Sequence, residues 1–493
     1  MPKFNNFING QFQANEALSY FANVNPADSG DIIGEFPLSD KATVDSAVQS
    51  AKSAFKSWKL MPAPKRGDIL RIAGDIFTSR KQELAKIMTR EMGKPTFETE
   101  GDVQEAIDTC YYAASETRRL FGYTVPSEMF EKVNMSFRVP IGVCGIITAW
   151  NFPIAVPSWK IIPALAAGNT VVWKPSEDAP HSGQIFAEIL KEAGVPDGVF
   201  NVVHGQGATG WEMVNNPDIH LIGFTGSTET GKKIAEVCGR TNKKLSLEMG
   251  GKNPQIVMDD ANLELALEGA VWGAYGTTGQ RCTATSRLIL HEKIYDKFID
   301  MLTEKATKLV LGSGLENGID VGPVINQKAV EKILGYIEIA KNEGAKLVYG
   351  GEKATEGKLA NGNFIKPTLF KDVTPAMRIF KEEVFGPVLV AVKIKSLEEA
   401  IEVANATEYG LSSSIFTNDV RSTWIAARDL EAGITYINAP TIGAEAHMPF
   451  GGVKGTGNGH REGGWTVFDI FTEWKTLYVD YSNKLQRAQI DNY

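Results

Sequence analysis

The sequence predicts an α/β fold built from two successive parallel sheets, each covered by helices. Between residues 143 and 251, continuous apolar runs such as "VCGIITAW" and "NTVVWKP" alternate with helical patterns such as "SGQIFAEILKEAG". Apolar strands of this kind are typical of a parallel sheet that is buried on both faces. The same alternation resumes between residues 253 and 438. The 493 residues include 48 glycines, which favours many tight turns.

Helices are predicted for most of the first third of the chain. Residues 43–58 carry apolar side chains at helical spacing. The segments "PKRGDILRIAGDIFTSRKQELAKIMTREMG" and "FETEGDVQEAIDTCYYAASETRRLFG" continue this pattern. Each of these segments ends on glycine, a common stop signal at a helix C-terminus, so we expect each helix to end there.

Two further segments alternate apolar and polar residues, as antiparallel strands do. They are "MSFRVPIG" near residue 135 and "TEWKTLYVDYS" near the end of the chain. A late strand outside the α/β units can pair across a subunit boundary, or it can be an ordinary edge strand. The residues alone leave both interpretations open.

The composition excludes several classes of protein. A hydrophobic fraction of 43%, a charged fraction of 22% and a net charge of −8 are typical of a soluble globular protein and argue against a nucleic-acid surface. No run of about 20 apolar residues predicts a membrane span, and the N-terminus lacks the apolar core of a signal peptide. The cysteines are far apart, which argues against a disulfide framework and a metal site. We expect a cytoplasmic protein in which Cys282 is a free thiol.

Two glycine-rich loops are candidates for binding phosphate groups. "HGQGATG" contains Gly205, Gly207 and Gly210, a formal G-x-G-x-x-G after a strand. "FTGSTETG" joins a strand to a helix that Ser227 and Thr228 can cap. Because a helix N-terminus with free N–H groups binds anions, we favour the second loop for a pyrophosphate. A plain capped turn is the alternative.

The segment "WKPSE" supports a nucleotide site. Lys174 and Glu177 follow a predicted strand, at the edge of the sheet where ligands bind in open α/β folds. A carboxylate at this edge suits a ribose diol and repels a 2′-phosphate, which favours NAD over NADP. Solvated loop charges are the alternative interpretation.

Three side chains suggest covalent chemistry on a carbonyl group. Cys282 in "TTGQRCTA" is a candidate nucleophile, which needs help to ionise at neutral pH. Glu248 ends an apolar strand, and a partly desolvated carboxylate there can act as a base. The Asn151 amide, also at a strand end, can donate to an oxyanion. A structural carboxylate and a helix-capping asparagine are the alternatives for the last two.

Ordered along the whole chain, the motifs "AWNFP", "WKPSE", "FTGSTETG", "LEMGGKNP", "GQRCTA", "EEVFGPV" and "PFGGVKGTGNGHRE" resemble those of the aldehyde dehydrogenase superfamily. The resemblance implies oxidation of an aldehyde to an acid. It assigns Cys282 as nucleophile, Glu248 as general base and Asn151 as oxyanion donor together with the Cys282 backbone N–H. Glu248 argues for hydrolysis of the thioester, because relatives that transfer the acyl group to coenzyme A tend to lack this base.

The resemblance also implies a cofactor, NAD with NADP as the alternative, and the residues that bind it. In the family the helix after "FTGS" faces the pyrophosphate, and the "GQGATG" loop lies near the adenine. The implied cofactor-binding residues are Ile147, Trp150, Lys174, Glu177, Gly207, Ser227, Glu383 and Phe385.

By the same resemblance, a Rossmann-type NAD(P)-binding domain spans residues 1–122 and 143–251, with a return segment at 456–472. A catalytic domain spans 252–455. Residues 123–142 and 473–493 form a small β arm for oligomerisation. The implied assembly is a homodimer or homotetramer.

The substrate is predicted less sharply than the reaction. "INAPTIGAEAHMPFGG" resembles a subgroup that contains 2-oxoglutaric semialdehyde dehydrogenases, and Glu445 and His447 suit a charged or oxidised aldehyde. Long-chain or aromatic aldehydes are the alternative, with an apolar funnel formed by Trp272, Tyr275, Phe450 and Trp465, unless these aromatic residues belong to the core. A non-catalytic relative and a thiol-dependent acyl hydrolase are the alternatives of another class.

Overall fold

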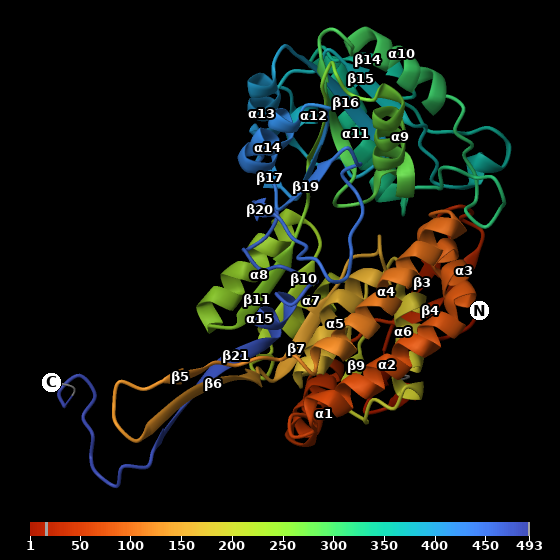
Figure 1. Ribbon diagram of the computed structural model, residues 1–493. Helices are drawn as coiled ribbons and strands as arrows, with labels where there is room; N and C mark the ends of the chain where they lie inside the picture. Colours follow the sequence, from red (N-terminus) through yellow and green to blue (C-terminus); the bar gives the residue numbers. More distant parts are fainter. Residues whose placement is uncertain (15–17, 492–493) are drawn as a thin grey trace.

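The computed structural model describes residues 1–14 and 18–491 and has the predicted α/β architecture. Two bodies, each with a parallel sheet between helices, lie one above the other in Figure 1, and a long β arm projects from the lower one. Among the described residues, no helix is long and apolar enough to cross a membrane.

The first sheet has the strand order β11-β10-β7-β8-β9-β1-β2. Its parallel strands are β7 (Val143–Ile147), β8 (Thr170–Lys174), β9 (Phe200–Val202), β10 (Leu221–Thr225) and β11 (Lys244–Glu248). Strand β1 (Asn6–Ile8) pairs antiparallel with β9 and with β2 (Gln11–Gln13). The order runs from β7 outward in both directions, so the connection from β9 to β10 crosses back over β7 and β8.

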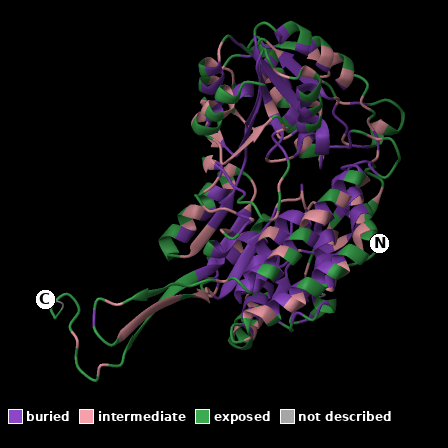
Figure 2. Cartoon of the chain, in the orientation of Figure 1, coloured by how far each residue is buried: buried purple, intermediate pink, exposed green. Residues whose placement is uncertain are grey.

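Helices cover both faces of this sheet because the side chains of its strands alternate in direction. Cys144 and Ile146 of β7 belong to one core, and Val143 and Ile147 belong to another. The helices of this body are α1 (Lys41–Trp58), α2 (Ala63–Ser79), α3 (Lys81–Met92), α4 (Thr96–Glu116), α5 (Ala155–Ala167), α6 (Pro180–Glu192), α7 (Gly207–Asn215), α8 (Thr228–Thr241) and α15 (Val467–Phe471). Figure 2 shows the buried strands between the half-exposed helices.

The second sheet has the order β14-β15-β16-β13-β12-β18-β19 and is parallel except for β14. Its strands are β12 (Asn253–Val257), β13 (Thr285–His291), β14 (Lys346–Tyr349), β15 (Thr368–Lys371), β16 (Val388–Ile394), β18 (Ser412–Phe416) and β19 (Ile434–Ile437). Its helices are α9 (Leu263–Tyr275), α10 (Tyr295–Ala306), α11 (Gln327–Asn342), α12 (Arg378–Lys381), α13 (Leu397–Asn405) and α14 (Val420–Asp429), with short 3₁₀ turns at Gly276–Gly279 and Gly357–Asn361.

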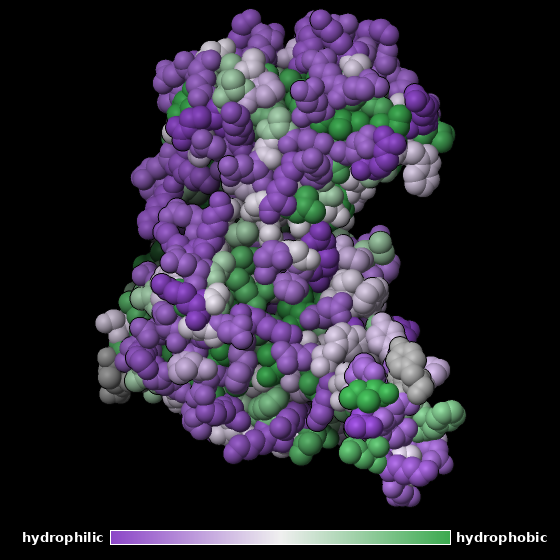
Figure 3. All heavy atoms as spheres, turned by 90° about the vertical axis from the view of Figure 1, so that its left-hand side faces the viewer, coloured by the Kyte–Doolittle hydropathy of each residue, from purple (hydrophilic) through white to green (hydrophobic). Residues whose placement is uncertain are grey.

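The two alternating segments form the arm and pair with each other. Strand β21 (Thr472–Asp480) runs antiparallel to β6 (Lys132–Pro140) over its whole length, and β5 (Thr124–Pro126) completes the sheet. The residues of β21 after Thr472 are exposed. On the face shown in Figure 3, apolar side chains stand among hydrophilic ones on this arm.

The helical prediction for the first third is confirmed, with three differences. The segment expected as one helix is split at Arg80 into α2 and α3. Helix α3 ends as predicted at Gly93, whose φ of 89° only glycine adopts readily. Helix α4 ends at Glu116, before Gly122, so that glycine is not its stop.

The third difference is a set of strands before α1. Besides β1 and β2, the hairpin of β3 (Tyr20–Val24) and β4 (Ile32–Pro37) precedes the helices. A further short pair, β17 (Tyr409–Gly410) with β20 (Val453–Lys454), closes the second body. These strands have two to six residues, too short for periodicity to reveal.

Candidate active site

The strand order of the first sheet places a crevice beside the ends of β7 and β10. The order reverses between these two neighbours, and ligands of open α/β sheets bind at such a switch point. Ile147 ends β7 and pairs with Phe224 of β10. Ser227 follows β10 and caps α8, where its hydroxyl oxygen accepts a hydrogen bond from Thr230 N. The amide groups of the first turn of α8 therefore point toward this edge.

Cys282 lies in the connection between α9 and β13, where the second body meets this crevice. Thr277 and Thr278 adopt positive φ angles of 51° and 55°, which are unusual for residues with a branched β-carbon. Glu98 of α4 holds this turn, because its carboxylate accepts hydrogen bonds from the backbone N–H and the hydroxyl of Thr277. The same carboxylate contacts Arg281 at 2.6 Å.

The structure brings Asn151 and Glu248 to the same connection. Asn151 is buried and donates from Nδ2 to the backbone oxygen of Gln280, 3.0 Å away. Glu248 ends β11, and its negative charge contributes to the raised pKa of Cys282. Asn151 and Glu248 are 97 positions apart in the sequence, and Glu248 and Cys282 are 34 apart. The fold nevertheless brings all three residues to one site.

The surroundings of Glu248 suit a general base. It is 4% exposed, and neither of its carboxyl oxygens has a hydrogen-bond partner among the described residues. Burial, and then the neighbouring charge of Glu462, raise its pKa well above the ordinary value. Lys160 and Arg461 oppose this shift. Lys160 and Glu462 themselves form a buried ion pair.

The surroundings of Cys282 strongly oppose the ionisation of its thiol. Burial, and then the charges of Glu248 and Glu383, raise its pKa to about 12. Backbone N–H groups of Thr283 and Cys282 oppose this shift. A thiolate at neutral pH therefore needs a positive charge or a base to arrive beside it.

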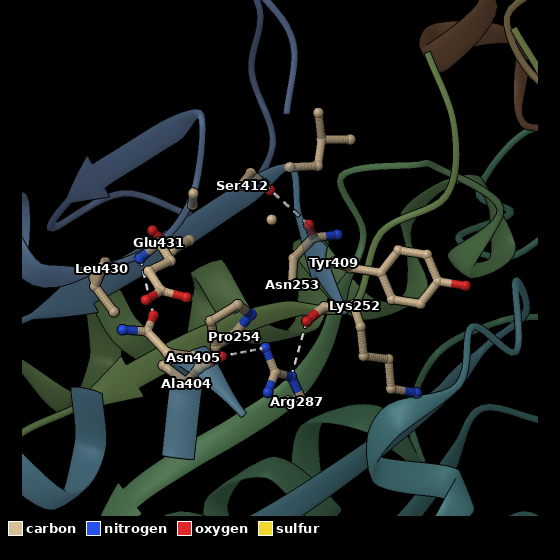
Figure 4. A pocket seen from close by; sticks show the side chains of 14 residues that line it. Lys252, Asn253, Pro254, Arg287, Ala404, Asn405, Tyr409, Ser412, Leu430 and Glu431 are labelled. Carbon is tan, nitrogen blue, oxygen red and sulfur yellow. Dashed lines mark hydrogen bonds between the residues drawn. The ribbon is translucent and has the colours of Figure 1, made fainter. Parts of the chain in front are cut away.

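The sequence patterns did not identify the residues that hold the backbone around Cys282. Asn253 of β12 donates from Nδ2 to the backbone oxygens of Cys282 and Ala284, at 2.8 and 2.9 Å. Figure 4 shows Asn253 in a small pocket, where its Oδ1 accepts from Ser412 N. Arg287 of β13 donates to the backbone oxygen of Lys252, which lies in the neighbouring connection between β11 and β12. Asn253 lies in the motif "LEMGGKNP", which was the available signal.

The other cofactor candidates come from both bodies. Lys174 ends β8 and lies 3.0 Å from the carboxylate of Glu177. The rings of Trp150 and Phe385 meet edge to face at 5.6 Å. Glu383 accepts a hydrogen bond from Gly251 N at 2.9 Å. Gly207 is the first residue of α7, and a Cβ added there would meet nothing within 4 Å.

These residues fit a dinucleotide. The α8 N-terminus offers amide groups to a pyrophosphate. The hydroxyl of Thr225, at the end of β10, is buried and has no hydrogen-bond partner among the described residues. A bound ligand can supply that partner. Glu177 is only half-buried, so its carboxylate can reach a ribose diol. "HGQGATG" leads into α7, and a Cβ added at its Gly210 would lie 3.7 Å from Ile147 Cδ1 and from Lys174 Cδ, so this segment also borders the switch point.

The aromatic residues predicted for a substrate funnel are not all together. Phe450 packs on Trp159 at a ring distance of 4.9 Å, and both line a small cavity with Glu445. Tyr275 is 1% exposed and bonds to Tyr349, so it belongs to the core. Trp465 contacts Phe121 at the base of the arm.

Two other predicted substrate contacts lie near the surface. Trp272 lies against Arg281, whose guanidinium carbon is 4.8 Å from its ring. His447 is exposed and lies 3.4 Å from Glu445. The funnel of four aromatic residues is therefore wrong, whereas Phe450 and Glu445 do line one cavity.

The chain is similar to known proteins over nearly its whole length. It is 40% identical over 475 residues to an alpha-ketoglutaric semialdehyde dehydrogenase of Bacillus subtilis, covering 96% of this chain and 97% of that one. It is 41% identical over 484 residues to mouse retinaldehyde dehydrogenase 3, covering 97% and 93%. The NAD+ complex of an aldehyde dehydrogenase from Bacillus cereus superimposes with a TM-score of 0.94 at 38% identity, covering 97% of each chain. Residues 12–477 match the profile of the aldehyde dehydrogenase family, and the chain belongs to this family.

Proposed function

We propose that this protein oxidises an aldehyde to a carboxylic acid with NAD+, through a covalent intermediate on Cys282. The observation that carries the proposal is the convergence of Cys282, Asn151 and the unpartnered Glu248 beside the switch point of the first sheet. Family membership supports the reaction class. The relatives' printed names support both the dehydrogenase activity and the cofactor.

The Cys282 thiol loses its proton to solvent, the thiolate sulfur attacks the aldehyde carbon, and the carbonyl oxygen becomes an oxyanion. Asn151 already donates one amide hydrogen to Gln280 O, and its second can donate to this oxyanion together with the Cys282 N–H. One such donor is worth about 3 kcal/mol in the transition state. Because Asn151 is buried and held by Gln280, it needs no reorganisation to act.

NAD+, when bound, accepts the hydride and brings a positive ring charge that favours the thiolate. The chain's own residues orient it in this proposal: Lys174 and Glu177 at the ribose, Gly207 near the adenine, Ser227 at the pyrophosphate, and Ile147, Trp150, Glu383 and Phe385 nearer the thiol. The carboxylate of Glu177 favours NAD over NADP, because it repels a 2′-phosphate.

Loss of hydride leaves a thioester on Cys282, which water must hydrolyse. Glu248 takes a proton from that water, since its raised pKa makes it a stronger base than an exposed carboxylate. Hydrolysis releases the acid and regenerates Cys282, whose sulfur leaves as a thiolate, and Glu248 passes its proton to that sulfur or to solvent. The Lys160–Glu462 pair lies beside Glu248 and sets the electrostatic field in which this proton moves.

We propose 2-oxoglutaric semialdehyde, or a closely similar semialdehyde, as the substrate. The names of similar proteins from Bacillus subtilis and other organisms support it. The cavity that Glu445 lines also contains Glu105, whose carboxyl group can form a hydrogen bond with an oxidised tail. The aromatic pair Trp159–Phe450 and the similarity to retinaldehyde dehydrogenase 3 favour the second candidate, a long apolar aldehyde.

The domain boundaries and assembly stay proposals as well. The predicted return segment 456–472 packs with the first body, because Val467, Phe468 and Ile470 belong to its core. The arm, residues 123–142 and 473–493, leaves β21 with an unpaired edge, which suits pairing with a second copy in a homodimer or homotetramer. We place the enzyme in the cytoplasm, since its three other cysteines are buried and unpaired.

Release of NADH on mixing with NAD+ and an aldehyde tests the reaction. We expect turnover by the wild type and none by Cys282→Ala, which has no sulfur to attack the carbonyl. Binding of NAD+, followed by calorimetry, should be nearly unchanged in the variant. Undiminished turnover by Cys282→Ala contradicts the assignment of the nucleophile, and a wild type that binds NAD+ but oxidises no aldehyde supports the non-catalytic alternative.

A further inference from the structure

Glu105 is half-buried, and its buried carboxyl oxygen Oε2 is used by neither the fold nor the proposed reaction. Helix α4 contains Glu98, Asp102 and Glu105, which are four and three residues apart. At this spacing the three acids lie on one face of the helix. That face points toward the connection that holds Cys282, because Glu98 bonds to Thr277.

Two of the three acids have structural partners. Glu98 accepts from Thr277 N at 3.0 Å and pairs with Arg281. Asp102 accepts from Lys94 Nζ at 2.7 Å and from Ala155 N at 2.6 Å. The buried Oε2 of Glu105 has no hydrogen-bond partner among the described residues.

Glu105 lines a cavity of about 30 Å³ between α4, α5 and the loop 444–450. The other walls include Trp159, Phe450, Met448, Glu445 and Asp108. Phe450 precedes Gly451, where an added Cβ would come within 2.8 Å of the Glu248 carboxylate. One wall of the cavity thus continues into the segment that lies beside the proposed base.

Tyr436 relates this cavity to the thiol. Burial, and then the charges of Cys282, Glu105 and Glu445, raise the pKa of Tyr436. Tyr436 therefore lies within electrostatic range of both the nucleophile and Glu105. A substrate whose aldehyde reaches Cys282 can place its far end against Glu105.

Glu105 keeps its proton at neutral pH. Burial, and then the negative charge of Asp102, raise its pKa to about 8, while Lys94 and Arg281 oppose the shift. Asp108 also raises it. The remaining titratable groups around the cavity are Glu445 and Tyr436, with His447 beyond Glu445. None of them is placed to neutralise an ionised Glu105.

We propose that Glu105 is a specificity-determining residue that donates a hydrogen bond, as a neutral carboxylic acid, to a carboxylate at the far end of the aldehyde. An acid–carboxylate bond of this kind is charge-assisted and therefore strong. When Glu105 loses its proton, it joins Asp108 and Glu445 in repelling an anionic tail. This role rests on the proposed function and names the chemistry that selects a semialdehyde.

The test compares two aldehydes that differ only in the distal carboxylate, 5-oxopentanoate and pentanal. The ratio of their kcat/KM values cancels every ionisation that both substrates share, including those of Cys282 and Glu248. For the wild type we expect this ratio to fall about tenfold between pH 7 and pH 9, because the protonated fraction of a group titrating near pH 8 falls by that factor. A ratio that is constant with pH overturns the proposal.

Two variants separate hydrogen bonding from charge. Glu105→Gln keeps an N–H donor without an ionisable proton, so its ratio should stay near the wild-type value at pH 7 and become independent of pH. Glu105→Leu should give a ratio about tenfold lower that does not change with pH. Glu100→Gln, on the same helix but not among the residues that line the cavity, is the control and should retain the wild-type pH profile.

The results distinguish this role from the reaction itself. If Glu105→Leu leaves the ratio unchanged while both aldehydes are oxidised, the proposed function stands and the role of Glu105 is wrong. If the wild type oxidises neither aldehyde with NAD+, the proposed function fails as well. A ratio that rises with pH also contradicts the proposal, because it indicates an anion-binding site that strengthens as Glu105 ionises.

Discussion

Two neighbouring carboxylates and burial govern the ionisation of the proposed catalytic thiol. Glu248 and Glu383 both raise the pKa of Cys282 through their charges. Glu248 is itself hard to ionise, because it is buried near Glu462. An ionised thiol and an ionised Glu248 therefore oppose each other, which suits a reaction in which the first acts before the second.

At the residue scale, Glu248→Gln should separate the two halves of the reaction. We expect the burst of NADH to remain, since hydride transfer does not need the base, and steady turnover to fall roughly 10²–10⁴-fold. In the wild type, deacylation should increase as the pH rises through the raised pKa of Glu248, because only the ionised form accepts a proton. Stopped-flow absorbance between pH 5 and pH 9 measures both phases. An equal loss of burst and turnover would contradict a purely hydrolytic role.

At the scale of elements, α4 supports the connections that carry the proposed catalytic residues. One face of this helix holds the strained turn at Thr277 and Thr278 through Glu98. The next acid on that face, Asp102, fixes the start of α5 by accepting from Ala155 N. Lys94 links this carboxylate to Asn151 O at 3.1 Å. A single helix therefore positions the connections that carry both Cys282 and Asn151.

Glu98→Gln should loosen this support. The change removes the charge that pairs with Arg281, whose side chain is 13% exposed against 1% for Glu98. Breaking a buried pair typically costs about 3 kcal/mol of stability. We expect a lower Tm and a lower kcat, because the turn before Cys282 is no longer held. Glu100→Gln, on the same helix, is the matched control. A variant with wild-type Tm and kcat would show that the turn keeps its geometry without Glu98.

For the whole molecule, the arm is the feature that a single copy leaves incomplete. Strand β21 lies at the edge of its sheet, and Leu477 and Tyr478 are 40% and 62% exposed. Exposed apolar edge strands of this length are usually covered in the native assembly. The arm projects away from both bodies, so a partner is better placed to cover it than the rest of this chain.

The double variant Leu477→Lys/Tyr478→Lys tests the arm. Lysine on an edge strand opposes pairing with another strand, so the mass measured by light scattering should decrease to that of a smaller species. Trp424→Lys, which replaces an exposed residue of α14 that is 73% exposed, is the control and should keep the native mass. If the wild type is already a monomer, or if the double variant keeps its mass, the arm has another role.

Much of this protein is determined locally in its sequence. The alternation of apolar strands and helices indicated two parallel sheets, and the alternating segments near residues 135 and 475 indicated the arm strands, because side-chain periodicity depends only on neighbouring residues. Local signals failed where tertiary packing decided the outcome. Helix α4 ends before Gly122, and β1 joins the sheet through pairing with a strand about 195 residues later.

Only the tertiary structure decided how the site is assembled. The motifs named Cys282, Glu248 and Asn151, but the strand order and the turn held by Glu98 bring them together. The tertiary structure also decided that Tyr275 is buried in the core, away from any substrate, and that Glu105 Oε2 has no hydrogen-bond partner among the described residues. The physical reason is that burial, partners and pKa depend on contacts between residues far apart in the chain, and local sequence patterns carry no record of those contacts.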